Sequence, residues 1–83
     1  MPDQASLPKP DEVLDTLGLY CPVPIWEAAK QIQRMKAGRV LEVLSDDDQI
    51  VDDMPTWCRR TGNEYLGLTQ DGSEYHVFVR KSR

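Results

Sequence analysis

Cysteine, histidine and long apolar runs are all scarce in this 83-residue sequence, which has two cysteines and one histidine. No apolar run approaches the roughly 20 residues needed to span a bilayer, so neither a membrane-spanning helix nor a membrane partner is expected. Cys21 and Cys58 are too few for a disulfide scaffold. Together with His76 they lack the spacing of a zinc site, which needs about four ligands. We therefore expect no bound metal and no resident cofactor.

Positive charge is also scarce, because 10 lysines and arginines face 14 aspartates and glutamates, for a net charge of −4. Nucleic-acid binding by bulk electrostatics needs a clustered positive surface, so direct contact with nucleic acid is not expected. Residues 1–10 hold three prolines and no apolar block. We interpret residues 1–11 as a flexible tail and not as a signal peptide. Residues 12–83 then form one small domain, and the expected location is the cytoplasm, where thiols stay reduced.

Hydrophobic periodicity predicts six elements in the order β-α-β-α-β-β. The expected strands are residues 12–17, 39–44, 64–70 and 73–81, and the first helix is 24–36. A second helix is expected to begin at an Asp53 cap, with Pro55 in its first turn, and to end near residue 61.

Short β-α-β crossovers favour parallel neighbours, and Asp71-Gly72 is typical of a hairpin turn. The fold class we expect is therefore an α/β (α+β) two-layer sandwich, with a mixed four-stranded sheet and both helices on one face. The other face carries His76 and Phe78, and a partner or a second copy of the chain could cover it. A monomer or weak homodimer is expected.

The most informative motif is Cys21-Pro22-Val23-Pro24, which follows a turn at Gly18 and precedes an amphipathic helix. Proline makes up about 5% of residues, so a cysteine precedes Pro-x-Pro by chance only about once in 400 cases. Pro22 and Pro24 stiffen the loop, and the start of the helix favours a negative charge. These features predict a Cys21 thiolate, which is a reactive nucleophile. Packing of Cys21 as a small buried hydrophobe remains the alternative.

The run Leu14-Asp15-Thr16-Leu17-Gly18-Leu19-Tyr20-Cys21-Pro22-Val23-Pro24 resembles the signature of the TusA/SirA family of small sulfur-carrier proteins, Leu-Asp-x-x-Gly-x-x-Cys-Pro-x-Pro. The similarity continues through Gly38, Asp46-Asp47, Asp53-x-Pro55, Cys58 and the final hairpin, and so covers residues 12–81. The resemblance implies that Cys21 accepts sulfane sulfur as a persulfide, with Gly18, Pro22 and Pro24 shaping its loop. It implies a cysteine desulfurase or rhodanese-type donor and a downstream acceptor protein, serving tRNA thiolation, sulfur oxidation or cofactor assembly.

Five further residues are candidates for docking a partner: Trp26, Lys30, Arg34, Asp46 and Asp47. Tryptophan is enriched at interface hot spots, although Trp26 could equally be partly buried. The two basic residues could simply form a solvated helix face. The two aspartates could simply begin the second helix.

Two other classes of function remain open from the sequence. One is a regulatory or interaction module in which Cys21 is structural. The other is a thiol redox protein that cycles Cys21 with Cys58, although Cys58 lies on the apolar face of the second helix and is expected in the core. His76 is expected to be structural, and no sequence feature places a general base beside Cys21.

Overall fold

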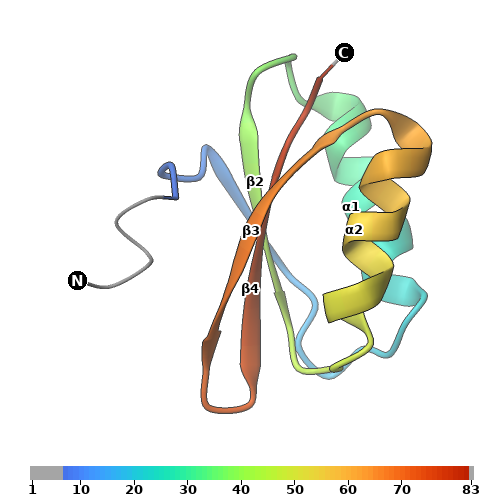
Figure 1. Cartoon of the computed structure of the whole chain (residues 1–83), viewed down its shortest axis with the longest axis vertical. Helices are drawn as coiled ribbons and strands as arrows, with labels where there is room; N and C mark the ends of the chain where they lie inside the picture. Colours follow the sequence, from blue (N-terminus) through green and yellow to red (C-terminus); the bar gives the residue numbers. More distant parts are fainter. Residues whose placement is uncertain (1–6, 83) are drawn as a thin grey trace.

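The computed structural model describes residues 7–82 and contains six elements (Figure 1). In chain order they are β1 (Glu12–Asp15), α1 (Val23–Arg34), β2 (Val40–Ser45), α2 (Ile50–Thr61), β3 (Glu64–Asp71) and β4 (Glu74–Arg80). The predicted order β-α-β-α-β-β is confirmed. Residues 1–6 of the expected tail lie outside the described residues.

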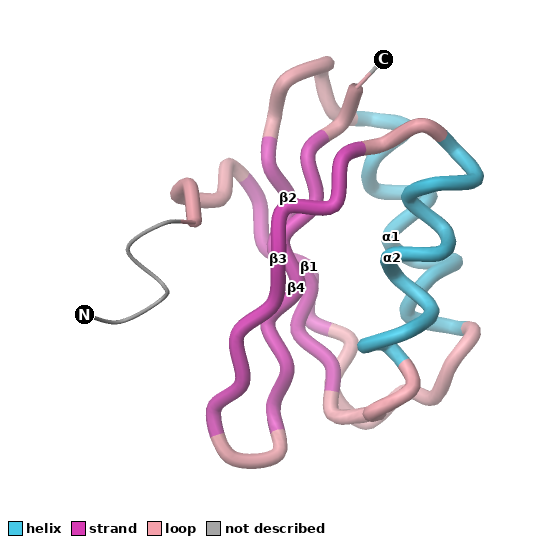
Figure 2. The backbone as a smooth tube through the Cα atoms, in the orientation of Figure 1, coloured by secondary structure: helices cyan, strands magenta, loops and turns pink. Residues whose placement is uncertain are grey.

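The four strands form one mixed sheet in the order β1-β2-β4-β3. β1 and β2 are parallel because α1 carries the chain back between them. β4 pairs antiparallel with both β2 and β3. Both helices lie on one face of the sheet (Figure 2). The expected two-layer α+β sandwich is therefore confirmed.

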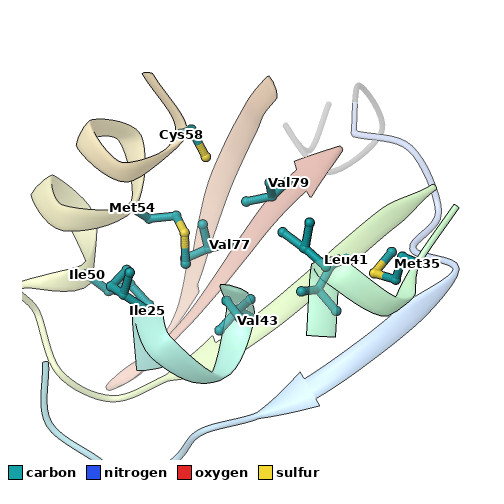
Figure 3. Close-up of a cluster of buried hydrophobic side chains, with 11 residues drawn as sticks. Ile25, Met35, Leu41, Val43, Ile50, Met54, Cys58, Val77 and Val79 are labelled. Carbon is teal, nitrogen blue, oxygen red and sulfur yellow. The ribbon is translucent and has the colours of Figure 1, made fainter. Parts of the chain in front are cut away.

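The core lies between the helices and this face of the sheet (Figure 3). The core residues of each helix are spaced by three or four positions, and the core residues of β2 and β4 alternate along each strand. The main contributors are Ile25, Ala28 and Ile32 of α1, Leu41 and Val43 of β2, Ile50, Met54 and Cys58 of α2, and Val77 and Val79 of β4. The side chain of Cys58 is directed toward the sheet, which confirms its predicted place in the core.

The opposite face of the sheet is partly covered by the chain's own segment Leu7–Pro10. Phe78 lies on this face and is only 9% exposed. A cavity of about 360 Å³ lies between the segment and the sheet, and its polar wall includes the hydrogen-bonded contact of His76 Nδ1 with Glu42 Oε2, at 2.6 Å. Leu7 occupies the space over Gly67, where a Cβ atom would lie 3.0 Å from Leu7 Cδ2. The absence of a side chain at position 67 therefore lets the segment lie close to β3.

The start of α2 differs from the prediction, because the helix begins at Ile50 and the expected cap at Asp53 is wrong. The first turn forms earlier because the Asp47 carboxylate accepts the Gln49 N–H at 3.1 Å and the Asp47 carbonyl accepts the Ile50 N–H at 3.1 Å. Pro55 consequently lies inside the helix, where its missing N–H leaves one carbonyl without its usual donor.

The predicted hairpin is confirmed, but its turn lies one residue further along. Asp71 pairs with Glu74, so Gly72 and Ser73 are the two central residues. Gly72 has φ of 61°, which fits a type II′ turn with glycine in the first central position. The other strand and helix ends differ from the prediction by one or two residues, as is usual for boundaries. Within residues 7–82, no helix is long and apolar enough to cross a membrane.

Candidate functional site

Cys21 lies in the loop that joins β1 to α1, at the edge of the sheet where β1 and β2 end. The loop that joins β2 to α2 lies beside it (Figure 1). This proximity follows from the topology, because parallel neighbours end at the same edge. Residues far apart in the sequence therefore meet around Cys21.

The Cys21 loop is held to β2 and to the following loop at three points. The Thr16 hydroxyl donates to the Leu44 carbonyl. The N–H of Gly18 donates to the Asp46 carboxylate, at 3.1 and 3.2 Å to its two oxygens. The N–H of Cys21 donates to Asp47 Oδ2 at 2.8 Å. The aspartates considered for partner docking thus have a structural contact with the reactive loop.

Asp47 is the more central of these two aspartates. Its Oδ2 atom accepts the Cys21 N–H, and its Oδ1 atom accepts the Gln49 N–H before α2. These two hydrogen bonds lower the pKa of the Asp47 carboxyl below its ordinary value, so the group stays ionised. A fixed negative charge therefore lies next to the backbone of Cys21.

The residues expected to shape the loop occupy the predicted places. Gly18 has φ of 84°, which confirms its turn conformation. Pro22 is exposed at the N-cap position of α1, the Cys21–Pro22 peptide bond is cis, and Pro24 is buried in the first helical turn. Cys21 itself is partly buried and packs against the core, so its sulfur is neither sealed nor fully exposed.

The prediction that Cys21 ionises easily is wrong. Burial is the largest cause that raises the pKa of the thiol, from 9.0 to about 12. A hydrogen bond to the Asp53 carboxylate and the negative charges of Asp47 and Asp53 add to it. The helix start offers few N–H donors to the thiol, since Val23 and Trp26 donate theirs to carbonyls at 2.9 and 3.1 Å and proline has no N–H. Cys21 is therefore a neutral thiol at rest.

We expect slow alkylation of Cys21 by iodoacetamide in the native protein. At pH 8, raising the pKa from 9.0 to about 12 lowers the thiolate fraction about 1,000-fold. Each thiolate is about 20-fold more nucleophilic, so the net rate should be about 50-fold lower than for an ordinary exposed cysteine. The rate should rise tenfold per pH unit up to at least pH 10, as followed by mass spectrometry. A plateau below pH 9 would show that the thiol ionises readily.

A groove between α1 and α2 opens beside Cys21 and has a volume of about 290 Å³. Its lining residues are Pro22, Ile25, Trp26, Ala29, Asp53, Thr56, Trp57 and Arg60. Trp26 is 60% exposed, so the structure places it on the surface at the cysteine end of α1. Exposed aromatic rings beside a reactive atom are suited to contact another protein.

Neither of the two basic docking candidates lines this groove. Lys30 is exposed and pairs with Glu27 at 3.1 Å. Arg34 is at the last turn of α1, about 16 Å along the helix axis from its first residue. The structure therefore brings Trp26 near Cys21 but leaves Arg34 at the opposite end of the helix.

Asp53 is the site residue that sequence reasoning missed. The sequence predicts a helix cap at this residue, whereas the structure places Asp53 in the wall of the groove beside Pro22, where its negative charge contributes to raising the pKa of the Cys21 thiol. It lies three residues after Ile50 on the amphipathic helix α2, which packs beside α1. Because the helix was predicted to begin at Asp53 and not at Ile50, the sequence did not show that the Asp53 side chain faces the groove.

These features define a class of protein: a small α+β domain with one accessible thiol on an anchored loop before a helix. A family model described as "Sulfurtransferase TusA" matches residues 12–81. The chain therefore belongs to the TusA sulfurtransferase family, as its motif indicated.

Curated relatives and a solved structure agree with this assignment. The chain is 38% identical to the "Sulfur carrier protein TusA" of Allochromatium vinosum, over 87% of this chain and 95% of that protein. It is 42% identical to the "Putative sulfur carrier protein YrkF" of Bacillus subtilis over 83% of this chain, but spans only 37% of that protein. The crystal structure of a SirA-like protein from Desulfitobacterium hafniense matches with a TM-score of 0.69 and 28% identity, covering 87% of this chain and 99% of the other.

Proposed function

We propose that this protein is a sulfur carrier that takes up sulfane sulfur on Cys21 and passes it to another protein. The observation that carries this proposal is the setting of Cys21, a partly exposed thiol on an anchored loop beside a groove with two tryptophans. Cys58, the other thiol, is 1% exposed. Membership of the family and the printed names of the relatives support the same function.

The proposed transfer conserves atoms and electrons. Cys21 sulfur attacks the outer sulfur of a donor persulfide, forming a new S–S bond as the bond to the donor cysteine breaks. The products are a Cys21 persulfide and a donor thiol, which receives the proton that Cys21 loses. An acceptor thiol then attacks the outer sulfur of Cys21, and Cys21 leaves as a thiol. The sulfur moves without any net oxidation, so no external oxidant is needed.

The partners of this reaction are proteins whose own cysteines reach Cys21. A cysteine desulfurase or a rhodanese-type protein fits the role of donor. The acceptor belongs to tRNA thiolation, sulfur oxidation or cofactor assembly. The exposed ring of Trp26, on the first turn of α1, is the surface feature best suited to anchor either partner.

The test is a loading experiment with a cysteine desulfurase and cysteine. The protein is separated after the reaction and its intact mass is measured without reductant, followed by peptide mapping. We expect a gain of one sulfur atom located on the peptide that contains Cys21. No gain from active desulfurase and from an active rhodanese-type donor would refute sulfur transfer and favour an interaction module.

The redox alternative finds less support. Cys58 is directed into the core, and burial raises the pKa of its thiol to about 11. A resolving cysteine must reach the sulfur that it attacks, and this one is enclosed by core side chains.

A further inference from the structure

The groove between α1 and α2 has a regular construction. Its lining includes one stripe of residues from each helix: Pro22, Trp26 and Ala29 along α1, and Asp53, Trp57 and Arg60 along α2. Each stripe steps by four and then by three residues, so its members share one side of their helix. Both helices begin at the edge of the sheet where β1 and β2 end (Figure 1). The two stripes therefore run in the same direction, away from the Cys21 end of the molecule.

The groove is largely apolar and open at the surface. Trp26 is 60% exposed, whereas Trp57 is partly buried and packs against the core. Ala29 lines the end away from Cys21, and its small side chain lets another backbone approach closely there. Seven residues separate the ends of each stripe, which is about 10 Å, or about two turns of helix.

The lining favours a helical occupant over an extended one. Because the lining residues belong to two helices, they offer side chains to a partner and not the edge of a sheet. An extended segment seated here would leave its backbone N–H and C=O groups without partners. A helix satisfies its own backbone groups, and its ridges of side chains pack against stripes spaced by three and four residues.

The charges at the two ends give the groove a direction. Asp53 lies at the end near Cys21, and Arg60 lies seven residues further along α2. They are the two charged residues among the described residues that line the groove. A complementary helix has a basic residue opposite Asp53, an acidic residue about two turns away opposite Arg60, and apolar residues between them.

We propose that this groove binds an amphipathic helix of the sulfur donor, with the basic end of that helix toward Cys21 and its acidic end toward Arg60. This inference rests on the proposed sulfur-carrier function, because it concerns the protein that loads Cys21. Pro22 lines the groove and directly follows Cys21 in the chain. The donor segment that adjoins the basic end of the helix then carries the persulfide to the Cys21 sulfur. Docking in this way makes the encounter of the two sulfur atoms effectively intramolecular.

The first test fills the far end of the groove with Ala29→Gln, a substitution that keeps a good helix former. Loading is measured with excess desulfurase persulfide, or with a rhodanese-type persulfide if only that donor loads the wild type. The donor concentration for half-maximal rate should rise about tenfold, as for loss of an interface contact. The rate at saturating donor and the rate of alkylation by iodoacetamide should change little, because the substitution lies away from Cys21.

Lys30→Gln is the matched control, since it introduces the same residue at the next position, which is exposed and does not line the groove. It should leave the half-saturating concentration of the donor unchanged. A wild-type value in Ala29→Gln, with the protein folded by circular dichroism, would overturn the proposal.

A second pair of variants tests the direction of the charges. Arg60→Glu and Arg59→Glu both reverse the charge of an exposed arginine in the last turn of α2, but only position 60 lines the groove. Arg60→Glu should raise the half-saturating donor concentration about fivefold at low salt and less at high salt. Arg59→Glu should have little effect. Equal effects of the two variants would indicate a response to net charge and would contradict an acidic residue docked at Arg60.

Crosslinking identifies the element that occupies the groove. A photoreactive benzoylphenylalanine replaces Lys30, which lies beside the groove and whose substitution should not affect loading. After irradiation with the donor, peptide mapping should locate the crosslink on an amphipathic helix of the donor. A crosslink to a strand or an extended loop, or no crosslink while loading proceeds, would overturn the proposal. Failure of the wild type to load from either donor would instead refute the sulfur-carrier function.

Discussion

Replacing Cys21 with serine is expected to lower sulfur loading by more than about 100-fold, to the background of the mass measurement. A hydroxyl oxygen cannot form the S–S bond that holds the transferred sulfur. The remaining thiol, Cys58, is 1% exposed and directed into the core, so it cannot replace Cys21. The measurement is the intact mass after incubation with desulfurase and cysteine.

Cys58→Ala is the matched control for this experiment. It removes a buried sulfur and should destabilise the domain by about 1 kcal/mol, since a small core cavity is left. It should still load one sulfur atom, provided that circular dichroism shows a folded protein. Loss of loading in Cys58→Ala and retention in Cys21→Ser would reverse the assignment of the two cysteines.

The second large effect concerns stability. Leu41→Ala is expected to cost about 3 kcal/mol, because Leu41 is fully buried and its removal leaves a cavity in the core. Leu41 lies in β2, between β1 and β4, so neighbouring strands limit how far the site can collapse. For a domain of this size, a loss of about 3 kcal/mol lowers the melting temperature by about 12–24 °C. Thermal unfolding followed by circular dichroism measures this shift.

Val13→Ala provides the comparison for Leu41→Ala. Val13 lies in the neighbouring strand β1 but is 57% exposed. Its truncation should change the stability by about 0.5 kcal/mol or less. Equal shifts for the two variants would mean that the packing of β2 against the helices contributes little to stability.

The fold could be predicted because each element has a local pattern in the sequence. The spacing of Ile25, Ala28 and Ile32 is helical, and the final hairpin has its glycine turn. The start of α2 was missed because the turn that precedes it is held by Asp47, whose side chain also binds the distant Cys21 loop. A turn of this kind depends on the tertiary structure as much as on the local sequence.

The chemistry of the site was only partly predictable. The motif identified Cys21 and its place before a helix, and the structure confirms that position. The motif could not reveal the protonation of the thiol, because the carboxylates that oppose its ionisation lie 26 and 32 residues further along the chain, at Asp47 and Asp53. The helix start alone suggested a thiolate, and the assembled loops reverse that expectation.

Asp47 joins two backbone N–H groups on different segments, one at Cys21 and one at Gln49. The geometry of the sulfur site and the turn that leads into α2 consequently share Asp47 as a support. A change at this position alters folding and reactivity together, so reduced activity in such a variant has two inseparable causes. The negative charge near the thiol is better separated from architecture at Asp53, which lies in the wall of the groove and takes no part in these backbone hydrogen bonds.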